Sequence, residues 1–378
     1  MTSSDFDSYR PPDEPRRRKR RFGKDRGPQQ RPGSGIGGDG TREMSMVPPV
    51  EMEHAGGVDA EGFTSYYGHP VVKPAPWGEE VALYLFLGGV AGGSGVIAAG
   101  AQLSGRPTLR RNARLGALGA VGVGAIALVK DLGRPERFYN MMRTFKVTSP
   151  MSVGSWILSA FSGALGVAAV GDIDRMTGER LPLGPLRTPL RWVEAPAGLA
   201  AGLVGPPLAV YTAVLLADTA TPTWNAMHRD LQFVFVSSAS LAASGLALVT
   251  TPTSETKPAR ILGALGVIGE LTAMKMMESQ MDSVVAEPLH HGTPGKLLRW
   301  SERLAVVGGV GALFAGGFRP AAIASGAALL AASAFTRFGV FEAGIESAKD
   351  PRYTIVPQQR RLAARRAAGI TDDSITTA

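Results

Sequence analysis

Eight apolar stretches follow one another between Val81 and Gly344, and they constrain the fold more than any other feature of this 378-residue chain. A bilayer core of about 30 Å needs roughly 20 helical residues to cross it. Four of the stretches are long enough and carry no charge, at residues 81–105, 147–171, 195–217 and 231–254. We therefore predict an all-α integral membrane protein, with about eight transmembrane helices in a bundle.

The other four stretches are weaker, because 115–129, 304–318 and 320–336 are short and 261–281 contains three charged residues. A 15-residue helix rises only about 22 Å, so arginines that flank the short stretches must reach the surface or be buried in the bundle. We still predict a helix for each stretch. The alternative is a soluble helical protein, but the near-neutral average hydropathy comes from the polar ends of the chain.

Histidine and cysteine usage limits the chemistry of the predicted membrane domain. The five histidines all fall in predicted tails or loops: His54, His69, His228, His290 and His291. Axial ligands for a membrane haem project from facing helices, so we predict no haem here. The chain has no cysteine, so it holds no iron–sulfur cluster in the usual way. Lipid-soluble organic chemistry or transport remains, and any electrons must come from a partner.

The glycine-rich sequence GGVAGGSG, at Gly88 to Gly95, lies inside the first predicted span. It therefore does not form a loop around a phosphate group. Small residues inside a transmembrane helix let neighbouring helices approach closely. We predict close helix contacts at these positions.

The ends of the chain have a different composition. Residues 1–72 are rich in Arg, Pro, Gly and Asp and include RRRKRR at 16–21, which predicts a disordered basic tail. A twin-arginine export signal is rejected, because no apolar segment follows until Val81. A nucleic-acid-binding arm is an alternative, but a basic cluster tethered to a membrane favours anionic lipid, so we predict no nucleic-acid partner. Residues 73–348 form the predicted membrane domain, and 349–378 a cytoplasmic C-terminal tail.

An even number of spans places both termini on one face, which we call the N-side. Internal loops carry nine Lys and Arg on the N-side and eleven on the opposite face, which does not decide the orientation. The tails do, because residues 1–79 hold twelve basic residues and the C-terminal tail holds six. Moving such charge outward opposes the membrane potential. We predict that both termini are cytoplasmic.

Polar side chains of the predicted helices gather toward the N-side. Trp77, Glu80 and Tyr84 have the spacing i, i+3, i+7 and share one helix face, and Asp131 ends the second helix on the same side. Tyr211 lies at a depth similar to that of Tyr84 on the fourth helix. Alternatives remain open, because the two aromatic residues of the first helix also suit an interfacial belt, and Glu80 suits a solvated helix start.

Glu270 lies about 12 Å below the N-side end of the sixth predicted helix, with apolar neighbours on both sides. An ionisable group at such a depth is costly and usually functional. We predict that it transfers protons. Together these residues predict a polar pocket that opens on the N-side.

Four strings then suggest a family: PWGEEVALYLFLGGVAGG (76–93), KDLGRPERFYNMMRTFKVTSPMSVGSW (130–156), YTAVLLADTATPTWN (211–225) and RFGVFEAGIESAKDPRYTIVP (337–357). In this order, on eight helices, they resemble the NrfD-like family, whose relatives include the membrane subunit of polysulfide reductase. The resemblance implies a haem-free subunit of a bacterial plasma membrane that binds menaquinone or another quinone. It implies electron exchange with a four-cluster, ferredoxin-like iron–sulfur subunit, which serves a molybdopterin (molybdenum or tungsten) catalytic subunit.

The resemblance also implies roles for single residues. Tyr211 matches the tyrosine of a YTG-like motif of the quinone pocket, although Ala213 replaces its glycine. Alignment through LGGVAGG places Val81 and Tyr84 where polysulfide reductase has the asparagine and histidine that line its quinone. Val81 cannot form a hydrogen bond to a quinone carbonyl group, so Glu80 and Tyr84 are the available substitutes.

We therefore expect three groups of functional residues. The expected quinone-binding residues are Trp77, Glu80, Tyr84 and Tyr211; the expected proton-transfer residues are Asp131 and Glu270; and the expected partner-docking residues are Arg134, Arg137 and Trp224. The iron–sulfur partner should then dock on the N-side, close to the quinone.

Two other functions remain open. A secondary transporter also has polar residues in broken helices, and Pro206 and Pro207 are a candidate for such a break. A pure anchor would tether a peripheral complex without binding quinone.

Overall fold

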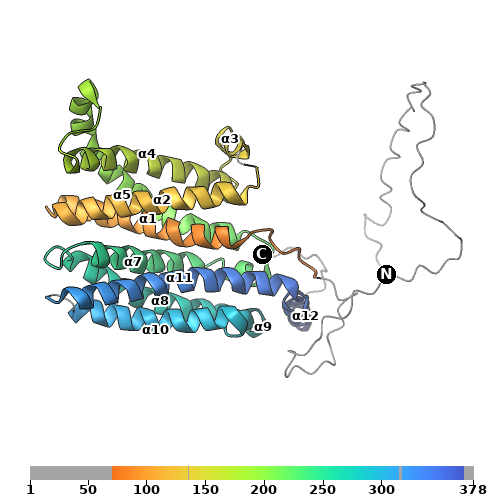
Figure 1. Ribbon diagram of the computed structural model, residues 1–378. Coiled ribbons are helices and arrows are strands. Elements are labelled where there is room, and N and C mark those ends of the chain that lie inside the picture. Colours follow the sequence, from red (N-terminus) through yellow and green to blue (C-terminus); the bar gives the residue numbers. More distant parts are fainter. Residues whose placement is uncertain (1–69, 135, 315–316, 370–378) are drawn as a thin grey trace, which may run out of the picture. The chain divides into compact units, whose positions relative to one another are not determined.

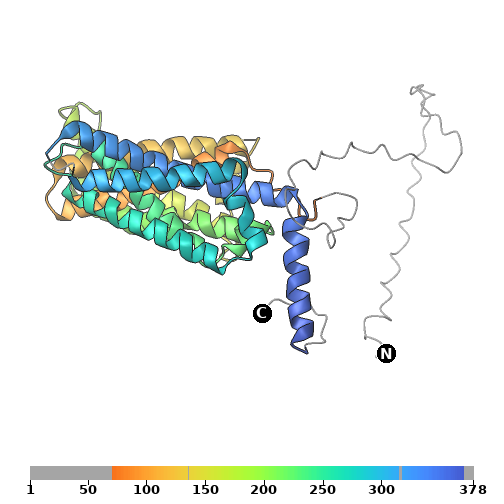
Figure 2. The same ribbon diagram turned by 90° about the horizontal axis from the view of Figure 1, so that it is seen from below.

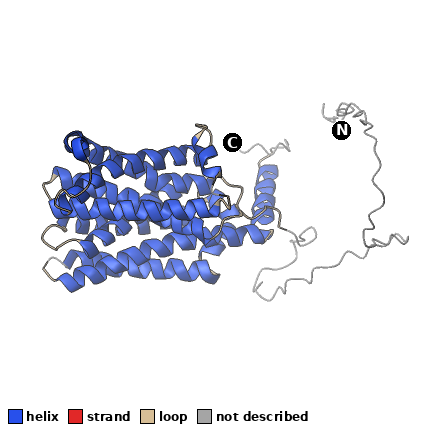
Figure 3. Ribbon diagram, turned by 45° about the horizontal axis from the view of Figure 1, so that its top comes forward, coloured by secondary structure: helices blue, strands red, loops and turns tan. Residues whose placement is uncertain are grey.

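The computed structural model describes residues 70–134, 136–314 and 317–369, all of which belong to one compact unit, Gly57–Ala378. Within these residues the secondary structure is helical, with loops between the helices (Figure 3). The eight longest helices are α1 (Glu79–Leu103), α2 (Pro107–Asp131), α4 (Pro150–Met176), α5 (Arg187–Ala217), α7 (Leu231–Thr250), α8 (Lys257–Gln280), α10 (Gly292–Phe314) and α11 (Arg319–Lys349). They coincide with the eight predicted stretches, and the predicted all-α membrane fold is confirmed.

The long helices form two groups of four. α1, α2, α4 and α5 pack together, and α7, α8, α10 and α11 form the second group (Figure 1). Contacts of α1 with α7 and α11, and of α5 with α7, join the two groups. α1 is therefore the central helix, and its side chains face both groups.

The glycines of α1 make the predicted close helix contacts. A side chain at Gly92 would overlap the carbonyl oxygen of Gly205 on α5, and a side chain at Gly93 would lie 2.6 Å from the carbonyl oxygen of Ala239 on α7. Only glycine lets these backbones approach so closely. Gly205 is followed by Pro206 and Pro207, yet α5 continues through both prolines as one helix. The helix break that would favour a transporter is therefore not present.

Six of the described helices are long and apolar enough to cross a membrane: α1, α2, α4, the stretch 184–217 that contains α5, α7 and α11. α8 and α10 are less apolar by this measure. They nevertheless expose apolar side chains on their outer faces, among them Leu265 and Ile268 on α8 and Val307 and Val310 on α10. This pattern, apolar outward and polar inward, suits contact with lipid on all sides of the bundle.

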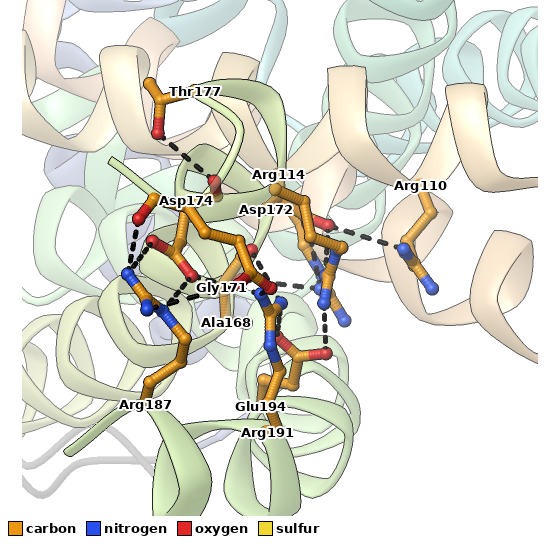
Figure 4. Close-up of polar contacts among 12 residues, drawn as sticks. Arg110, Arg114, Ala168, Gly171, Asp172, Asp174, Thr177, Arg187, Arg191 and Glu194 are labelled. Carbon is orange, nitrogen blue, oxygen red and sulfur yellow. Dashed lines mark hydrogen bonds and ion pairs between the residues drawn. The ribbon is translucent and has the colours of Figure 1, made fainter. Parts of the chain in front are cut away.

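Helix α2 is ten residues longer than the predicted 115–129 stretch, because its first turns are held by an ionic network at the end of the bundle opposite the N-side. Asp172 of α4 contacts Arg110 at 3.3 Å and Arg114 at 2.9 Å (Figure 4). It also contacts Arg175, at 2.7 Å. Asp174 contacts Arg187 and Arg191, each at 3.0 Å. Of the two sequence alternatives for Arg114, burial is the correct one, since only 2% of it is exposed.

Short helices lie between the long ones and after them. They are α3 (Arg137–Met142), α6 (Pro222–Ala226), α9 (Ser283–Ala286) and α12 (Arg352–Ala367), with 3₁₀ turns at Gly184–Leu186 and Glu287–Leu289. α1 begins and α11 ends on the same side of the bundle (Figure 1), as an even number of spans requires. α12 therefore lies inside the predicted C-terminal tail, at the N-side end.

Candidate functional site

The hydroxyl groups of Tyr84 and Tyr211 form a hydrogen bond to each other between α1 and α5. Their ring centroids are 6.4 Å apart, and Tyr84 is 3% exposed. Either hydroxyl group can be the donor. The structure thus brings together the two tyrosines that were predicted from different parts of the sequence.

A cleft of about 270 Å³ lies beside this tyrosine pair. It is lined by Val147, Thr148, Pro150, Val153, Tyr211, Val214 and Asp218. Its walls are mainly apolar, and the polar residues among them are Thr148, Tyr211 of α5 and Asp218, the C-cap of α5. An apolar cleft with a few fixed polar groups is the usual form of a small-molecule site.

Glycines position the two tyrosine rings. A side chain at Gly154 of α4 would overlap the ring of Tyr211. A side chain at Gly124 of α2 would lie 3.3 Å from the Tyr84 ring. These two small residues make the space in which the rings meet. Neither Gly154 nor Asp218 is predicted as a site residue from the sequence, because a glycine in an apolar run and an acid at a helix end give no specific signal.

Trp77 and Glu80 do not join the tyrosine pair. Trp77 precedes α1, so the helical spacing used to place it does not apply. Its ring stacks on Trp224, with centroids 5.7 Å apart. Glu80 forms an ion pair with Lys130 of α2, at 3.0 Å, and its side chain is 34% exposed. Of the four expected quinone-binding residues, Tyr211 lines the cleft and Tyr84 is joined to Tyr211 by a hydrogen bond.

The expected docking residues lie in different environments. Trp224 is fully buried, and its indole N–H donates a hydrogen bond to the carbonyl oxygen of Val340, at 2.8 Å. Its burial and this hydrogen bond show that it packs between α6 and α11, and its expected role in docking stays a prediction. Arg134 is exposed in the loop that follows α2. Arg137 begins α3, but its side chain lies outside the described part of the chain.

The expected proton-transfer residues are also separated. Asp131 is half-buried at the end of α2. Glu270 is buried, at 4% exposure, and its carboxylate accepts a hydrogen bond from the hydroxyl group of Thr336 on α11. The single pocket predicted from the sequence is thus divided, since Glu270 does not line the cleft beside Tyr211.

Glu270 lines a second cleft, of about 150 Å³, which lies between α8, α10 and α11. The ionisable side chains that line this cleft are Glu270, Lys275, Glu278, His290, Arg299 and Glu302. Glu278 lies 3.8 Å from the imidazole of His290. The cleft therefore connects the buried Glu270 with the polar N-side end of α8.

Arg337 of α11 lies at the centre of the bundle and is fully buried. It donates a hydrogen bond to the carbonyl oxygen of Phe235, at 2.5 Å, and its guanidinium group lies 3.8 Å from the centre of the Phe235 ring. Gly89 of α1 makes room for it, because a side chain there would lie 3.0 Å from Arg337 Nη2. Among the described residues, Arg337 Nε and Nη1 and Glu270 Oε2 have no hydrogen-bond partner. These buried polar atoms of α8 and α11 form a second polar region, apart from the tyrosine pair.

The chain matches a known protein family. Residues 71–282 match the family described as Polysulphide reductase, NrfD. The chain belongs to the NrfD family. The match to the NrfD family covers more than half of the chain, from the segment before α1 to the end of α8. No curated protein matches the chain.

The NrfD match contains three of the four strings that suggested the family, together with Tyr84, Tyr211 and Glu270. The fourth string, at 337–357, lies beyond it, so its resemblance stays a prediction. The chain is an integral membrane protein of this family. Among the described residues, no group of three or more His, Cys, Asp or Glu side chains has the arrangement of a metal site.

Proposed function

We propose that this chain is the quinone-binding membrane subunit of a molybdenum- or tungsten-type oxidoreductase complex. It would exchange electrons between an iron–sulfur partner subunit and menaquinone or another quinone. The observation that supports this most strongly is the Tyr84–Tyr211 pair beside the apolar cleft. Membership of the NrfD family supports the same function.

The two tyrosines suit the chemistry of a quinone headgroup. Reduction of a quinone adds two electrons and two protons at its two carbonyl oxygens. A tyrosine hydroxyl group placed at such an oxygen stabilises the charge that develops there. In the structure the Tyr84 and Tyr211 hydroxyl groups are hydrogen-bonded to each other. A bound headgroup replaces this hydrogen bond, and each hydroxyl group then bonds to the headgroup instead. Val147, Val153 and Val214 then line the apolar part of the cleft.

Protons for this reaction must come from groups that can titrate. Asp218 is the carboxylate residue that lines the same cleft as Tyr211, and we propose it as one source of protons. We propose that Glu270 and Asp131 also transfer protons, with Glu270 exchanging them with the N-side through the second cleft. We propose that Trp77 and Glu80 contribute to quinone binding indirectly. Trp77 does so through the packing of the chain before α1 on Trp224, and Glu80 through its ion pair with Lys130.

We propose that the iron–sulfur subunit docks on the N-side, near the exposed Arg134 and near Arg137. The reason is the distance that electrons must travel between the clusters of the partner and the quinone. This chain has no cysteine for a cluster of its own that could carry electrons through the bundle. The molybdopterin subunit would bind the iron–sulfur subunit. We further propose that the chain lies in a bacterial plasma membrane with both termini in the cytoplasm.

A binding experiment tests this function directly. The purified chain, in detergent, is titrated with a menaquinone analogue, and the affinity is compared with that of the Gly154→Val variant, whose added side chain displaces the Tyr211 ring. Gly163→Val is the matched control on the same helix, because a side chain at Gly163 meets open space. We expect binding by the native chain and by Gly163→Val, and weaker binding by Gly154→Val.

Co-purification supplies the second part of the test. An affinity-tagged chain should bring with it a protein that shows iron–sulfur absorbance. Failure to bind any quinone, together with co-purification of such a partner, would indicate a pure anchor.

A further inference from the structure

The described part of the chain buries five charged side chains, and two of them lie outside the ionic network of Asp172. The five are Arg114, Asp172, Asp174, Glu270 and Arg337. The first three belong to the network at the end of the bundle opposite the N-side. Glu270 of α8 and Arg337 of α11 remain. A buried charge in a membrane bundle is costly unless an opposite charge compensates it, so each of these two groups needs the other.

Contacts between the helices bring Glu270 and Arg337 into one region. Both belong to the group of α7, α8, α10 and α11, which faces the viewer in Figure 2. The hydroxyl group of Thr336 donates a hydrogen bond to Oε1 of Glu270, and Arg337 is the next residue along α11. The two oppositely charged side chains interact electrostatically. Because both are buried, little water screens this attraction.

Both groups keep polar atoms with which they can bind each other. Arg337 uses Nη2 for the carbonyl oxygen of Phe235, while its Nε and Nη1 have no hydrogen-bond partner. Oε2 of Glu270 has none either. Polar atoms buried this deeply are normally hydrogen-bonded to protein or to internal water. The guanidinium group and the carboxylate can therefore complete each other's hydrogen bonds, directly or through a water molecule between them.

The environment of Glu270 makes Arg337 its main positive neighbour. The other ionisable groups that face Glu270 across the second cleft are Lys275, Glu278, His290, Arg299 and Glu302. All of these except the half-buried Glu278 are exposed, so water screens their charges. α7, which packs against both α8 and α11, contains no ionisable residue. Arg337 does not line the cleft, so Glu270 lies between the arginine and the N-side.

We propose that Arg337 is the buried counter-ion of Glu270 and holds its carboxylate in the charged form, ready to take up a proton from the second cleft. Arg337 is then a positioning residue, since a guanidinium group does not itself release a proton. Proton uptake by Glu270 leaves Arg337 as an uncompensated buried charge, which favours release of the same proton. The part in proton transfer rests on the proposed function of Glu270, whereas the charge pair does not.

Infrared spectroscopy of the full-length chain in lipid nanodiscs tests the pair without quinone or partner subunits. A protonated carboxyl group gives a C=O stretching band that a carboxylate lacks, and the part of this band that Glu270→Gln removes belongs to Glu270. In Arg337→Gln this part should appear at a pH at least about one unit higher than in the native chain, because a nearby opposite charge favours the ionised form. Arg337→Lys keeps the charge and should lie closer to the native chain.

Two control comparisons separate charge from structure. Lys275→Gln removes a positive charge from the same cleft at an exposed position, and it should leave the Glu270 titration nearly unchanged. Gly89→Ala displaces the guanidinium group without removing its charge, because the added side chain would lie 3.0 Å from Arg337 Nη2. A side chain at Gly88 meets open space. Gly89→Ala should therefore move the titration, and Gly88→Ala should not.

Three results would overturn the proposal. They are equal titration of Glu270 in the native chain and in Arg337→Gln, a Glu270 band that is fully present at every pH in the native chain, and a shift in Lys275→Gln as large as that in Arg337→Gln. If Arg337→Gln does not fold, the comparison of Gly89→Ala with Gly88→Ala decides in its place. A native chain that binds no quinone but shows the shift would refute the proposed function and keep the charge pair.

Discussion

Tyr84 and Tyr211 are the residues on which the proposed quinone site depends, and each hydroxyl group satisfies the other. Tyr84→Phe and Tyr211→Phe should each lower quinol-dependent turnover in membranes about tenfold, as expected for a lost hydrogen bond of about 1.4 kcal/mol. Each single variant also leaves one buried hydroxyl group without a partner, so thermal unfolding should show a loss of about 1–3 kcal/mol.

The double variant separates stability from function. With both hydroxyl groups gone, no unpaired donor remains, so the double Phe variant should recover part of the lost stability. Its turnover should nevertheless stay low. Wild-type turnover and quinone affinity in both single variants would show that the site has been assigned to the wrong residues.

Glu270 gives a second prediction at this scale. Glu270→Gln should slow turnover while the complex still assembles, because the amide keeps the shape and accepts the Thr336 hydrogen bond but cannot titrate. Glu302→Gln, in the same cleft, is the matched control and should have a smaller effect, since Glu302 is exposed. Turnover unchanged at every pH would reduce Glu270 to a structural residue.

Among the elements, α2, α4 and α5 are joined by the ionic network around Asp172. Arg114 and Asp172 are both 2% exposed, so Asp172→Asn leaves a buried arginine with little compensation. Breaking a buried pair of this kind costs about 3–5 kcal/mol, which thermal unfolding in detergent would detect. Glu179→Gln removes a carboxylate that is 58% exposed in the same network and should change stability little. Equal stability of the two variants would contradict this role.

The start of α2 is held by a different contact. The N–H group of Leu109 donates a hydrogen bond to Glu255, at 2.9 Å, from the loop between α7 and α8. Partial burial acts to raise the pKa of Glu255, but this hydrogen bond, contacts with Thr108 and the charge of Arg106 outweigh it and hold the pKa below 4.5. A lowered pKa in the folded state means that the stabilisation is present above the ordinary value and is lost as the pH falls through the folded one.

Glu255→Gln should therefore remove part of the stability at pH 7, on the order of 1 kcal/mol as for other helix caps. The difference between Glu255→Gln and the native chain should disappear in acid, below the folded pKa. Unfolding curves of both proteins at several pH values measure this. A difference that persists unchanged in acid would show that the Glu255 charge does not contribute.

At the scale of the whole molecule, the orientation in the membrane is the main prediction. Single cysteines are easy to read in a cysteine-free chain. Ser104 is exposed in the turn after α1, on the face opposite the N-side. A membrane-impermeant thiol reagent added to intact cells should label Ser104→Cys and should not label Ser3→Cys. Selective labelling at Ser3 would reverse the orientation and move the proposed docking face outside.

The fold class and the order of the eight long helices follow from the sequence, because the length and apolarity of a span are local properties. Tyr84, Tyr211 and Glu270 were predicted as site residues in the same way, since a polar group inside an apolar run is visible without a partner, and their roles stay predictions. Glycine spacing in α1 likewise predicted the close contacts with α5 and α7.

Which polar groups contact one another depends on how the helices pack. The sequence sets the depth of a residue along its helix, but helix packing sets the direction in which its side chain faces. For this reason Tyr211 and Glu270, which were predicted to share one pocket, line two separate clefts. Trp77 met Trp224 because the chain before α1 is not helical. The length of α2 was underestimated because its arginines are neutralised by Asp172, a residue about 60 positions away in sequence. Charge compensation over such separations exists only after the helices have packed.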